Sequence, residues 1–284
     1  MKTAGGWFGG LLQGRLRAWA AMSVIVACGG SSTPKSITGG GGGGGGGSAV
    51  KALLEEDFST YSGTANLLAD PRGIYSTSED VETAQIVLDK SVGFDSSGQS
   101  MRYDFPDRTA DGGSGTTGRC TDYTIGRNIQ LPATVTEAWI EIVAKFDGSF
   151  TTVAPSGWGC TSAAAYKFVL PRTDASRFQL VVGIFGPDYT FGYPGNEEPA
   201  DWSMEWTPFD GQWHVYRMHV KCGNGTGVAT LWVDGVKLRD YENVTTSAGD
   251  IYGLALGRNV NQGPDHAQSV WWGRITIWDK DPLW

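Results

Sequence analysis

The sequence predicts an all-β fold for residues 51–284, an antiparallel β-sandwich. Three observations predict it: apolar residues recur at every second position, glycine-rich turns separate these segments, and the composition favours strands over helices. The 284 residues include 42 glycines and 12 tryptophans, whereas charged residues make up only 18%. Turns use glycine and strands use aromatic residues, while surface helices are rich in Glu and Lys. All-β sandwiches often contain about 200–250 residues, so one domain can account for this length.

The alternating segments are the expected strands. Within each of them one row of side chains is apolar and the other is mostly polar, so one row faces a core and the other faces away from it. These segments cover residues 101–105, 139–146, 177–185, 213–221, 229–234 and 275–277. Turn signals lie between them at residues 111–113, 223–225, 234–235 and 263–264. Short strands separated by such turns favour two antiparallel sheets packed face to face.

The first residues predict an export signal. A stretch with three basic residues precedes an apolar run over residues 18–27, which is too short to span a ~30 Å hydrocarbon core as a helix. A short apolar region after a positive one is typical of signal peptides. The run ends in Ile-Val-Ala-Cys at residues 25–28, which resembles the bacterial lipobox. The resemblance implies that residues 1–27 are a lipoprotein signal peptide and that Cys28 is lipidated; the alternative is ordinary cleavage nearby, with Cys28 incidental.

Residues 28–50 are expected to form a flexible tether. They include nine consecutive glycines at positions 39–47, a composition that cannot bury surface and behaves as a flexible coil. The lipoprotein resemblance implies that the membrane is a partner through the lipid anchor, and it places the protein in a bacterial cell envelope. Gly29, rather than Asp, follows the cysteine, which among Gram-negative lipoproteins favours the outer membrane.

The remaining cysteines predict a disulfide. With Cys28 lipidated, Cys120, Cys160 and Cys222 remain, and outside the cytoplasm two of three are expected to pair. Cys120 with Cys160 is favoured, because both lie in glycine-rich, loop-like contexts. Cys222 is then free, or it replaces one of the two partners, since sequence does not determine connectivity. A zinc site is disfavoured because no C-x-x-C pair is present and histidines are few.

Four short motifs near the end of the chain carry a resemblance to a known fold family. They are Gly-Gln-Trp-His at 211–214, Leu-Trp-Val-Asp-Gly at 231–235, Leu-Gly-Arg-Asn at 256–259 and Trp-Gly-Arg-Ile-Thr-Ile-Trp at 272–278. With these motifs, residues 205–284 resemble the concanavalin A-like and laminin G-like jelly rolls, and residues 53–204 resemble them only in architecture. The motifs form turns and core, so they do not specify a function.

The resemblance implies a polysaccharide ligand on the outward face of one sheet. Aromatic rings stack on sugar faces, and charged side chains hydrogen-bond to hydroxyl groups. The rows opposite the apolar ones carry such side chains, and the predicted substrate-binding residues are Arg102, Trp139, Glu141, Lys145, Arg217, His219 and Trp232. The expected function is therefore a lectin-like, carbohydrate-binding module. The alternative is that these are ordinary solvent-facing residues, with the two tryptophans covered by loops.

Two enzymatic alternatives and one structural alternative remain. A polysaccharide lyase that cleaves uronate glycans by β-elimination needs a base and a group that neutralises the carboxylate; His219, Arg217 and Arg102 are the candidates, although the motifs of the alginate-lyase relatives are absent. Glucanases of the superfamily carry E-x-D-x-x-E, whereas residues 137–141 supply only two glutamates, so hydrolysis is disfavoured. A non-catalytic structural or adhesion lipoprotein that binds protein partners is the third possibility.

Charge and acidic residues bear on nucleic acid and metal binding. The formal net charge of −8 argues against binding nucleic acid, which needs a basic surface. The resemblance to the jelly-roll family implies one candidate cofactor, a structural calcium ion that ties the edge strands. Asp57 and Asp279 lie near the two ends of the domain, which should be neighbours if the ends pair, and carboxylate oxygens suit calcium. The alternative is that both are solvent-exposed turn aspartates.

Overall fold

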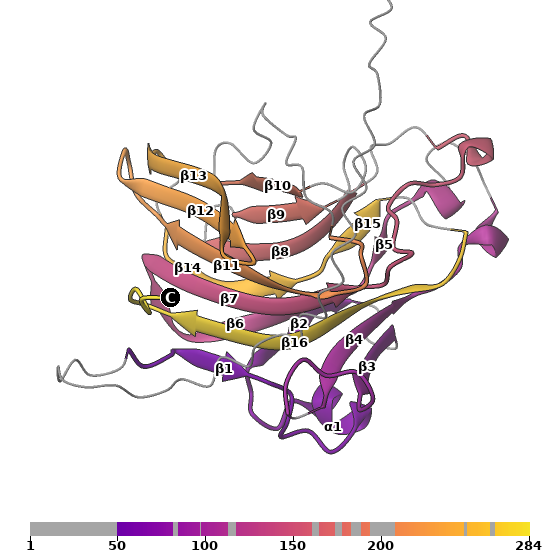
Figure 1. Cartoon of the computed structure of the whole chain (residues 1–284), viewed down its shortest axis with the longest axis horizontal. Helices are drawn as coiled ribbons and strands as arrows, with labels where there is room; N and C mark the ends of the chain where they lie inside the picture. Colours follow the sequence, from indigo (N-terminus) through magenta and orange to yellow (C-terminus); the bar gives the residue numbers. More distant parts are fainter. Residues whose placement is uncertain are drawn as a thin grey trace, which may run out of the picture. The chain divides into compact units, whose positions relative to one another are not determined.

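In the computed structural model, the described strands and helices all lie within residues 48–284 (Figure 1). The residues described are 50–81, 85–96, 98–112, 118–160, 165–173, 178–182, 189–193, 208–246, 249–261 and 265–284. The predicted signal peptide over 1–27, the lipidated Cys28 and nearly all of the predicted tether over 28–50 therefore lie outside the described residues. No helix within the described ranges is long and apolar enough to cross a membrane.

The described strands form two antiparallel sheets. In the first, which we call sheet A, the strand order is β13-β12-β11-β7-β16-β4-β3, and β1 pairs with the second half of β16. Its strands are β1 (Leu54–Glu56), β3 (Ile86–Asp89), β4 (Ser100–Phe105), β7 (Glu137–Phe146), β11 (Trp213–Lys221), β12 (Gly227–Val233), β13 (Val236–Val244) and β16 (Gln268–Trp278). The first and last strands of sheet A along the chain, β1 and β16, are therefore neighbours in the sheet.

The second sheet, sheet B, has the order β10-β9-β8-β14-β6-β2, and β15 pairs with β5 and β8. Its strands are β2 (Tyr75–Val81), β5 (Tyr123–Thr124), β6 (Gly126–Val135), β8 (Ala165–Thr173), β9 (Gln179–Val182), β10 (Tyr189–Gly192), β14 (Ile251–Leu256) and β15 (Asn259–Asn261). Helix α1 (Thr64–Ala69) and the short 3-10 helices η2 (Thr109–Asp111), η3 (Gly118–Cys120) and η4 (Ser156–Trp158) lie in the connections.

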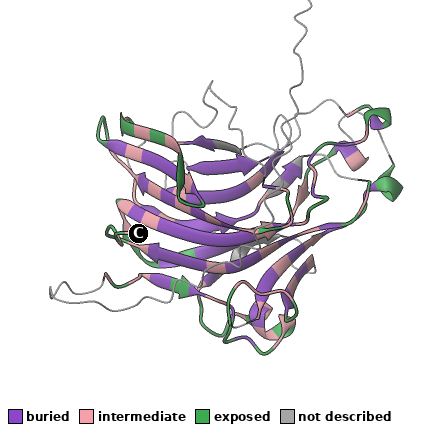
Figure 2. Ribbon diagram, in the orientation of Figure 1, coloured by how far each residue is buried: buried purple, intermediate pink, exposed green. Residues whose placement is uncertain are grey.

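The apolar rows of the two sheets form a shared core. Trp272 of sheet A is fully buried and stacks on Phe168 of sheet B, with ring centroids 4.8 Å apart. Along β11 the burial pattern alternates strictly between buried and half-buried residues, whereas β7 is buried along most of its length (Figure 2). The all-β, antiparallel sandwich predicted from the two-residue period is confirmed. In sheet A the alternation leaves one row of each strand on the face away from the core.

The predicted disulfide is confirmed. Cys120 and Cys160 are bonded, with Cα atoms 5.3 Å apart, and they link the last residue of η3 to the loop after η4. Cys222 is a free, half-buried thiol. Burial raises the pKa of Cys222 to about 11, so this thiol is protonated and unreactive at neutral pH.

The register of β1 against β16 separates the two aspartates that were expected to share an ion. The ends of the domain do pair, with Leu54 opposite Ile277 and Glu56 opposite Ile275. Asp57 therefore lies beyond one end of this ladder and Asp279 beyond the other, about 16 Å apart along the strands. Asp57 instead accepts hydrogen bonds from the backbone and hydroxyl of Ser59. The expectation that these two carboxylates meet is corrected: Asp57 is a turn aspartate.

The disulfide between Cys120 and Cys160 is expected to contribute measurably to the free energy of unfolding. Replacing both Cys120 and Cys160 with serine frees a loop with a sequence separation of 40, which costs about 4 kcal/mol of unfolding free energy in the loop-entropy account. Cys222→Ser is the matched control and should cost about 1 kcal/mol or less. Urea unfolding without reductant, followed by tryptophan fluorescence, measures both. Equal midpoints for the double variant and the control would contradict the assignment.

Candidate functional site

The outward rows of β7, β11 and β12 bring five of the predicted residues together. Arg217 lies opposite Glu141 on one neighbouring strand and opposite Trp232 on the other. His219 lies opposite Trp139 on β7. These side chains point away from the core because each alternates with fully buried neighbours on its own strand. The register in which β7, β11 and β12 pair brings these five side chains into one cluster, and this register cannot be read from the sequence.

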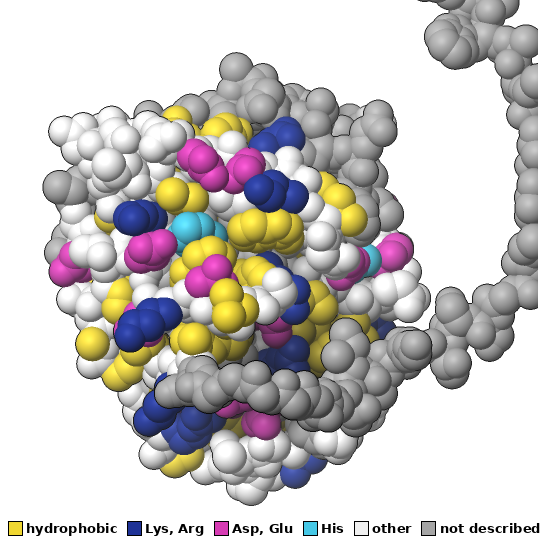
Figure 3. Space-filling model, turned by 60° about the vertical axis from the view of Figure 1, so that its left-hand side comes forward, with side chains coloured by type: hydrophobic (Ala, Val, Ile, Leu, Met, Phe, Trp, Pro, Cys, Tyr) yellow, Lys and Arg dark blue, Asp and Glu magenta, His cyan; other side chains and the backbone are white. Residues whose placement is uncertain are grey.

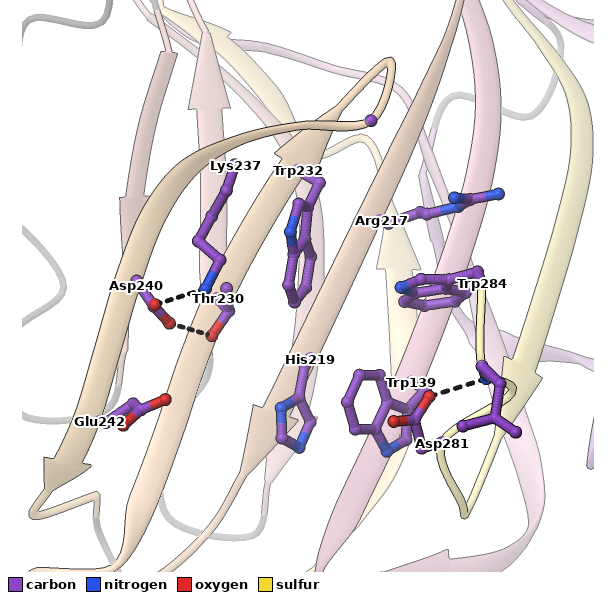
Figure 4. Close-up of a pocket in the computed structure, with 12 residues that line it drawn as sticks. Trp139, Arg217, His219, Thr230, Trp232, Lys237, Asp240, Glu242, Asp281 and Trp284 are labelled. Carbon is purple, nitrogen blue, oxygen red and sulfur yellow. Dashed lines mark hydrogen bonds and ion pairs between the residues drawn. The ribbon is translucent and has the colours of Figure 1, made fainter.

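A pocket of about 710 Å³ lies over this cluster (Figure 4). Its walls come from β7, β11, the β12–β13 hairpin and the segment after β16. The residues that line it are Trp139, Arg217, His219, Thr230, Trp232, Gly235, Lys237, Asp240, Glu242, Asp281, Leu283 and Trp284. Figure 3 shows a face on which hydrophobic side chains are interspersed with both basic and acidic ones. The pocket therefore combines aromatic surface with polar groups of both signs.

A stacked pair of rings lies at the bottom of the pocket. The rings of Trp139 and His219 are 3.7 Å apart and nearly parallel, at 5°. Glu137 Oε1 lies 2.6 Å from His219 Nε2, and Lys221 Nζ lies 3.4 Å from the other oxygen of the same carboxylate. A neutral imidazole that donates Nε2–H to Glu137 presents Nδ1 as an acceptor. The stack and the carboxylate together determine how the imidazole is oriented.

Trp284 forms one wall of the pocket. Its ring meets those of Trp139 and Trp232 nearly at right angles, with centroids 5.7 and 6.3 Å away. The guanidinium of Arg217 lies 5.0 Å from the Trp284 ring centroid, a distance at which a cation is attracted to an aromatic face. Sequence reasoning missed Trp284 because it considered strand rows, and this residue follows the last strand. The high tryptophan content of the C-terminal segment was the available signal.

A carboxylate held by two arginines lies beside the pocket. Glu141 Oε2 accepts a hydrogen bond from Arg217 Nε at 2.8 Å, and Glu141 Oε1 accepts one from Arg274 Nη2 at 2.7 Å. Glu141 is only 7% exposed although it faces away from the core. The arginines cover it, and each lies against an aromatic ring, Trp284 for Arg217 and Phe94 for Arg274. Glu141 therefore orders the face, and its two oxygens are already engaged.

The opposite wall is built by the β12–β13 hairpin. Lys237 Nζ lies 5.7 Å from the ring centroid of Trp232 and 2.6 Å from Asp240 Oδ2. Thr230 donates its hydroxyl to the other oxygen of Asp240 at 2.9 Å. The hydrogen bond from Lys237 is the main reason that the pKa of Asp240 lies below its usual value. These contacts keep an ionised carboxylate at the rim of the pocket.

Arg102 and Lys145 lie elsewhere on the same face. Strands β7 and β16 separate Arg102 on β4 from Arg217 on β11, a distance of about 14 Å across the sheet. Arg102 is bound by two carboxylates, Asp89 at 2.7 Å and Asp104 at 2.8 Å. Lys145 Nζ lies 5.3 Å from the ring centroid of Trp271. The expectation that Arg102 comes close to Arg217 and His219 is therefore corrected, because these two strands are not neighbours.

His214 and His266 lie outside the pocket, and each has an aspartate partner. His214 lies on the core side of β11, 6% exposed, with Nδ1 2.7 Å from Asp234 Oδ2 and Nε2 3.0 Å from Asp210 Oδ1. Burial disfavours its charge, but the hydrogen bonds to the two carboxylates outweigh burial and raise its pKa. His266 lies in an exposed loop beside Asp265. Within the described part of the chain, no three acidic, His or Cys side chains are grouped to hold a metal ion.

Comparisons with known proteins identify the fold. No family model matches the chain, and no curated protein matches it. Solved structures that match over most of both chains include an endo-β-1,4-glucuronan lyase of the fungus Trichoderma reesei, with a TM-score of 0.52 and 12% identity over 81% of this chain and 96% of that one. The catalytic domain of a glycoside hydrolase family 131 protein of Coprinopsis cinerea matches with a TM-score of 0.52 and 15% identity, over 81% of this chain and 95% of that one. A family 131 β-glucanase catalytic domain of Podospora anserina matches with a TM-score of 0.51 and 13% identity, over 80% of this chain and 95% of that one. The chain has the jelly-roll sandwich fold of these proteins.

The pairing at Glu141 predicts a loss of stability on removal of its charge. Glu141→Gln leaves one amide oxygen that can accept from one arginine and places an NH2 group, which only donates, against the other arginine. Because both arginines lose their carboxylate, this variant should cost about 1–3 kcal/mol of unfolding free energy. Glu242→Gln is the control, because this exposed residue of the same face should change stability by less than about 0.5 kcal/mol. Urea unfolding compares them; equal effects would contradict the inferred role of the carboxylate.

The surroundings of His214 predict a pH dependence of stability. A pKa raised in the folded protein stabilises it fully below the unfolded value of about 6.5, and this contribution is lost as the pH rises through the folded pKa. The stability difference between the parent and His214→Asn should therefore shrink as the pH rises from about 6.5 into the alkaline range. Unfolding free energies measured across that range test this. A difference that stays constant or grows would show that the imidazole is not charged in the fold.

Proposed function

We propose that the domain binds a polysaccharide in the pocket over β7, β11 and β12, as a lectin-like module. The observation that carries the proposal is that three tryptophans, Trp139, Trp232 and Trp284, line one pocket of about 710 Å³. Planar aromatic surfaces match the apolar faces of sugar rings, and sites for small molecules are concave and mostly apolar with a few placed polar groups.

The polar groups of the pocket support a ligand rich in hydroxyl groups. Asp240, Asp281 and Glu242 are carboxylates at the rim, and an ionised carboxylate accepts several hydrogen bonds. Arg217 gives Nε–H to Glu141 and has further N–H donors on the same guanidinium. The solved structures with the same fold include a glucuronan lyase and a β-glucanase domain. Both of those proteins act on polysaccharides, which supports a polysaccharide ligand for this chain.

We also propose that the module is displayed on a bacterial cell envelope. The basic and apolar stretches before Cys28, and the glycine run that follows it, support export, a lipid anchor and a tether. Two acyl chains suffice for stable anchoring, whereas one does not. On this proposal the membrane is a partner, through the anchor, and the outer membrane is the expected location.

A polysaccharide lyase is the second candidate. The observation in its favour is that His219 and Arg217 line the same pocket and that Glu137 orders the imidazole. The third group assigned to it, Arg102, is bound by Asp89 and Asp104 on a distant strand. Incubation of the protein with glucuronan, alginate and pectate separates the two candidates. A rise in the ultraviolet absorbance of unsaturated uronate products, abolished in His219→Ala, would establish the lyase.

Binding through the tryptophans predicts the effect of removing them. Trp139→Ala and Trp232→Ala should each weaken binding to the preferred polysaccharide about tenfold, because a stacking contact of about 1.4 kcal/mol is lost. A pull-down on insoluble polysaccharides, followed by affinity measurement on the bound one, gives the comparison.

The control for both variants is Tyr252→Ala. Tyr252 is a half-buried aromatic residue of β14 that lies against Arg172 of β8. Both residues belong to sheet B, whereas the pocket lies on sheet A. This variant should bind like the parent. If all three variants bind equally well, or if the parent retains no polysaccharide, the tryptophan pocket is not a glycan site.

A further inference from the structure

We propose that the pocket is one end of a longer site, and that its ligand is an uncharged glycan chain lying along β7. This inference rests on the proposed function. The other end of the site is a second aromatic group on the outward face of sheet A, formed by Phe94, Trp213 and Trp271. The three rings are half-buried, so each offers part of its surface to a ligand.

The second aromatic group lies across three neighbouring strands. Trp213 on β11 is opposite Lys145 on β7, and Lys145 is opposite Trp271 on β16. Phe94, from the connection between β3 and β4, packs edge-on against Trp213 with ring centroids 5.8 Å apart. Lys145 lies against the ring of Trp271. The group therefore has the same make-up as the pocket, aromatic rings with a cation beside them.

Gly273 allows these rings to lie against the sheet. A Cβ atom at this position would come within 2.7 Å of Phe94 Cβ and within 2.9 Å of the Trp213 ring. The β16–β7 pairing also shifts register between Trp272 and Arg274, which marks a bulge that redirects side chains locally. A glycine at the bulge thus makes room for two aromatic rings on the face away from the core.

The distance between the two aromatic groups requires a chain as ligand. Trp139 and Lys145 mark the two groups on β7, and their six-residue separation corresponds to about 20 Å of strand. A single sugar ring cannot contact both groups. Between them lie Arg217 and Arg274, held by Glu141 and carrying further N–H donors that can meet hydroxyl groups. A glycan of several units would contact the rings at both ends and the guanidinium groups in the middle.

The charges along this path favour an uncharged chain. Each arginine is already bound by a carboxylate: Arg217 and Arg274 by Glu141, and Arg102 by Asp89 and Asp104. Lys237 and Lys221 are likewise paired, with Asp240 and Glu137, whereas Lys145 lies over the Trp271 ring and is the one basic group of the path with no carboxylate among the described ion pairs. A polyuronate would have to displace these carboxylates or lie beside them, and like charges brought together cost affinity. Neutral hydroxyl groups can add hydrogen bonds without breaking the pairs.

The test measures how affinity depends on chain length and charge. Calorimetry on the full chain compares neutral disaccharides and hexasaccharides of β-linked glucose, xylose and mannose with hexasaccharides of glucuronate and mannuronate. We expect a neutral hexasaccharide to bind at least about tenfold more tightly than its disaccharide, because only the longer chain reaches both aromatic groups. We expect the uronate hexasaccharides to bind more weakly than the neutral one.

Variants locate the second group. Trp271→Ala should weaken hexasaccharide binding about tenfold and leave disaccharide binding unchanged, whereas Trp139→Ala should weaken both. Trp271→Phe, which keeps a ring, should restore most of the loss and shows that the effect of Trp271→Ala is not a folding defect. Equal affinity for both lengths, or tighter binding of a uronate, would overturn this inference while leaving the pocket as a glycan site. Absence of all glycan binding would overturn the proposed function itself.

Discussion

The outward face of sheet A depends on one carboxylate with two arginine partners. Glu141 is on the central strand β7, and its partners Arg217 and Arg274 are on the strands on either side. The bridge therefore ties three strands together on the side that has no second sheet against it. It also holds each guanidinium against an aromatic ring. Without the carboxylate, two positive charges would repel each other across β7, and the rings of Trp284 and Phe94 would lose their partners.

The two-residue alternation of the sequence determines which face of the sheet a side chain occupies. The register in which strands pair determines which side chains lie beside it. The alternation along β11 and β7 placed Arg217, His219 and Trp139 on the same face, as the structure shows. It could not show that β4 lies two strands beyond β7, because pairing between segments far apart in sequence leaves no local pattern. Arg102 was therefore grouped with residues that it does not meet.

The same limit explains the residues outside the strand rows. Trp284 has no periodic context, so nothing local indicates that it packs against Trp139. The calcium hypothesis used the correct expectation that the ends of the domain pair, but the offset of the β1–β16 ladder separates Asp57 from Asp279. The disulfide was predictable because it needed only the number of cysteines and their loop-like contexts. The sandwich and the disulfide were thus predictable from period and composition, whereas the meeting of Arg102 with His219, and of Asp57 with Asp279, depended on a strand register that no local pattern records.

The wall formed by Trp284 differs from the rest of the site in how it is held. Trp139, His219 and Trp232 belong to strands with backbone ladders on both sides, whereas the segment after β16 is held by ring contacts and by a local hydrogen bond from Leu283 N to Asp281. Segments with few backbone hydrogen bonds open at a lower free energy than the sheet they rest on. Warming or mild denaturant should thus detach this wall while the sandwich stays folded, and affinity for the proposed polysaccharide would decline well before global melting.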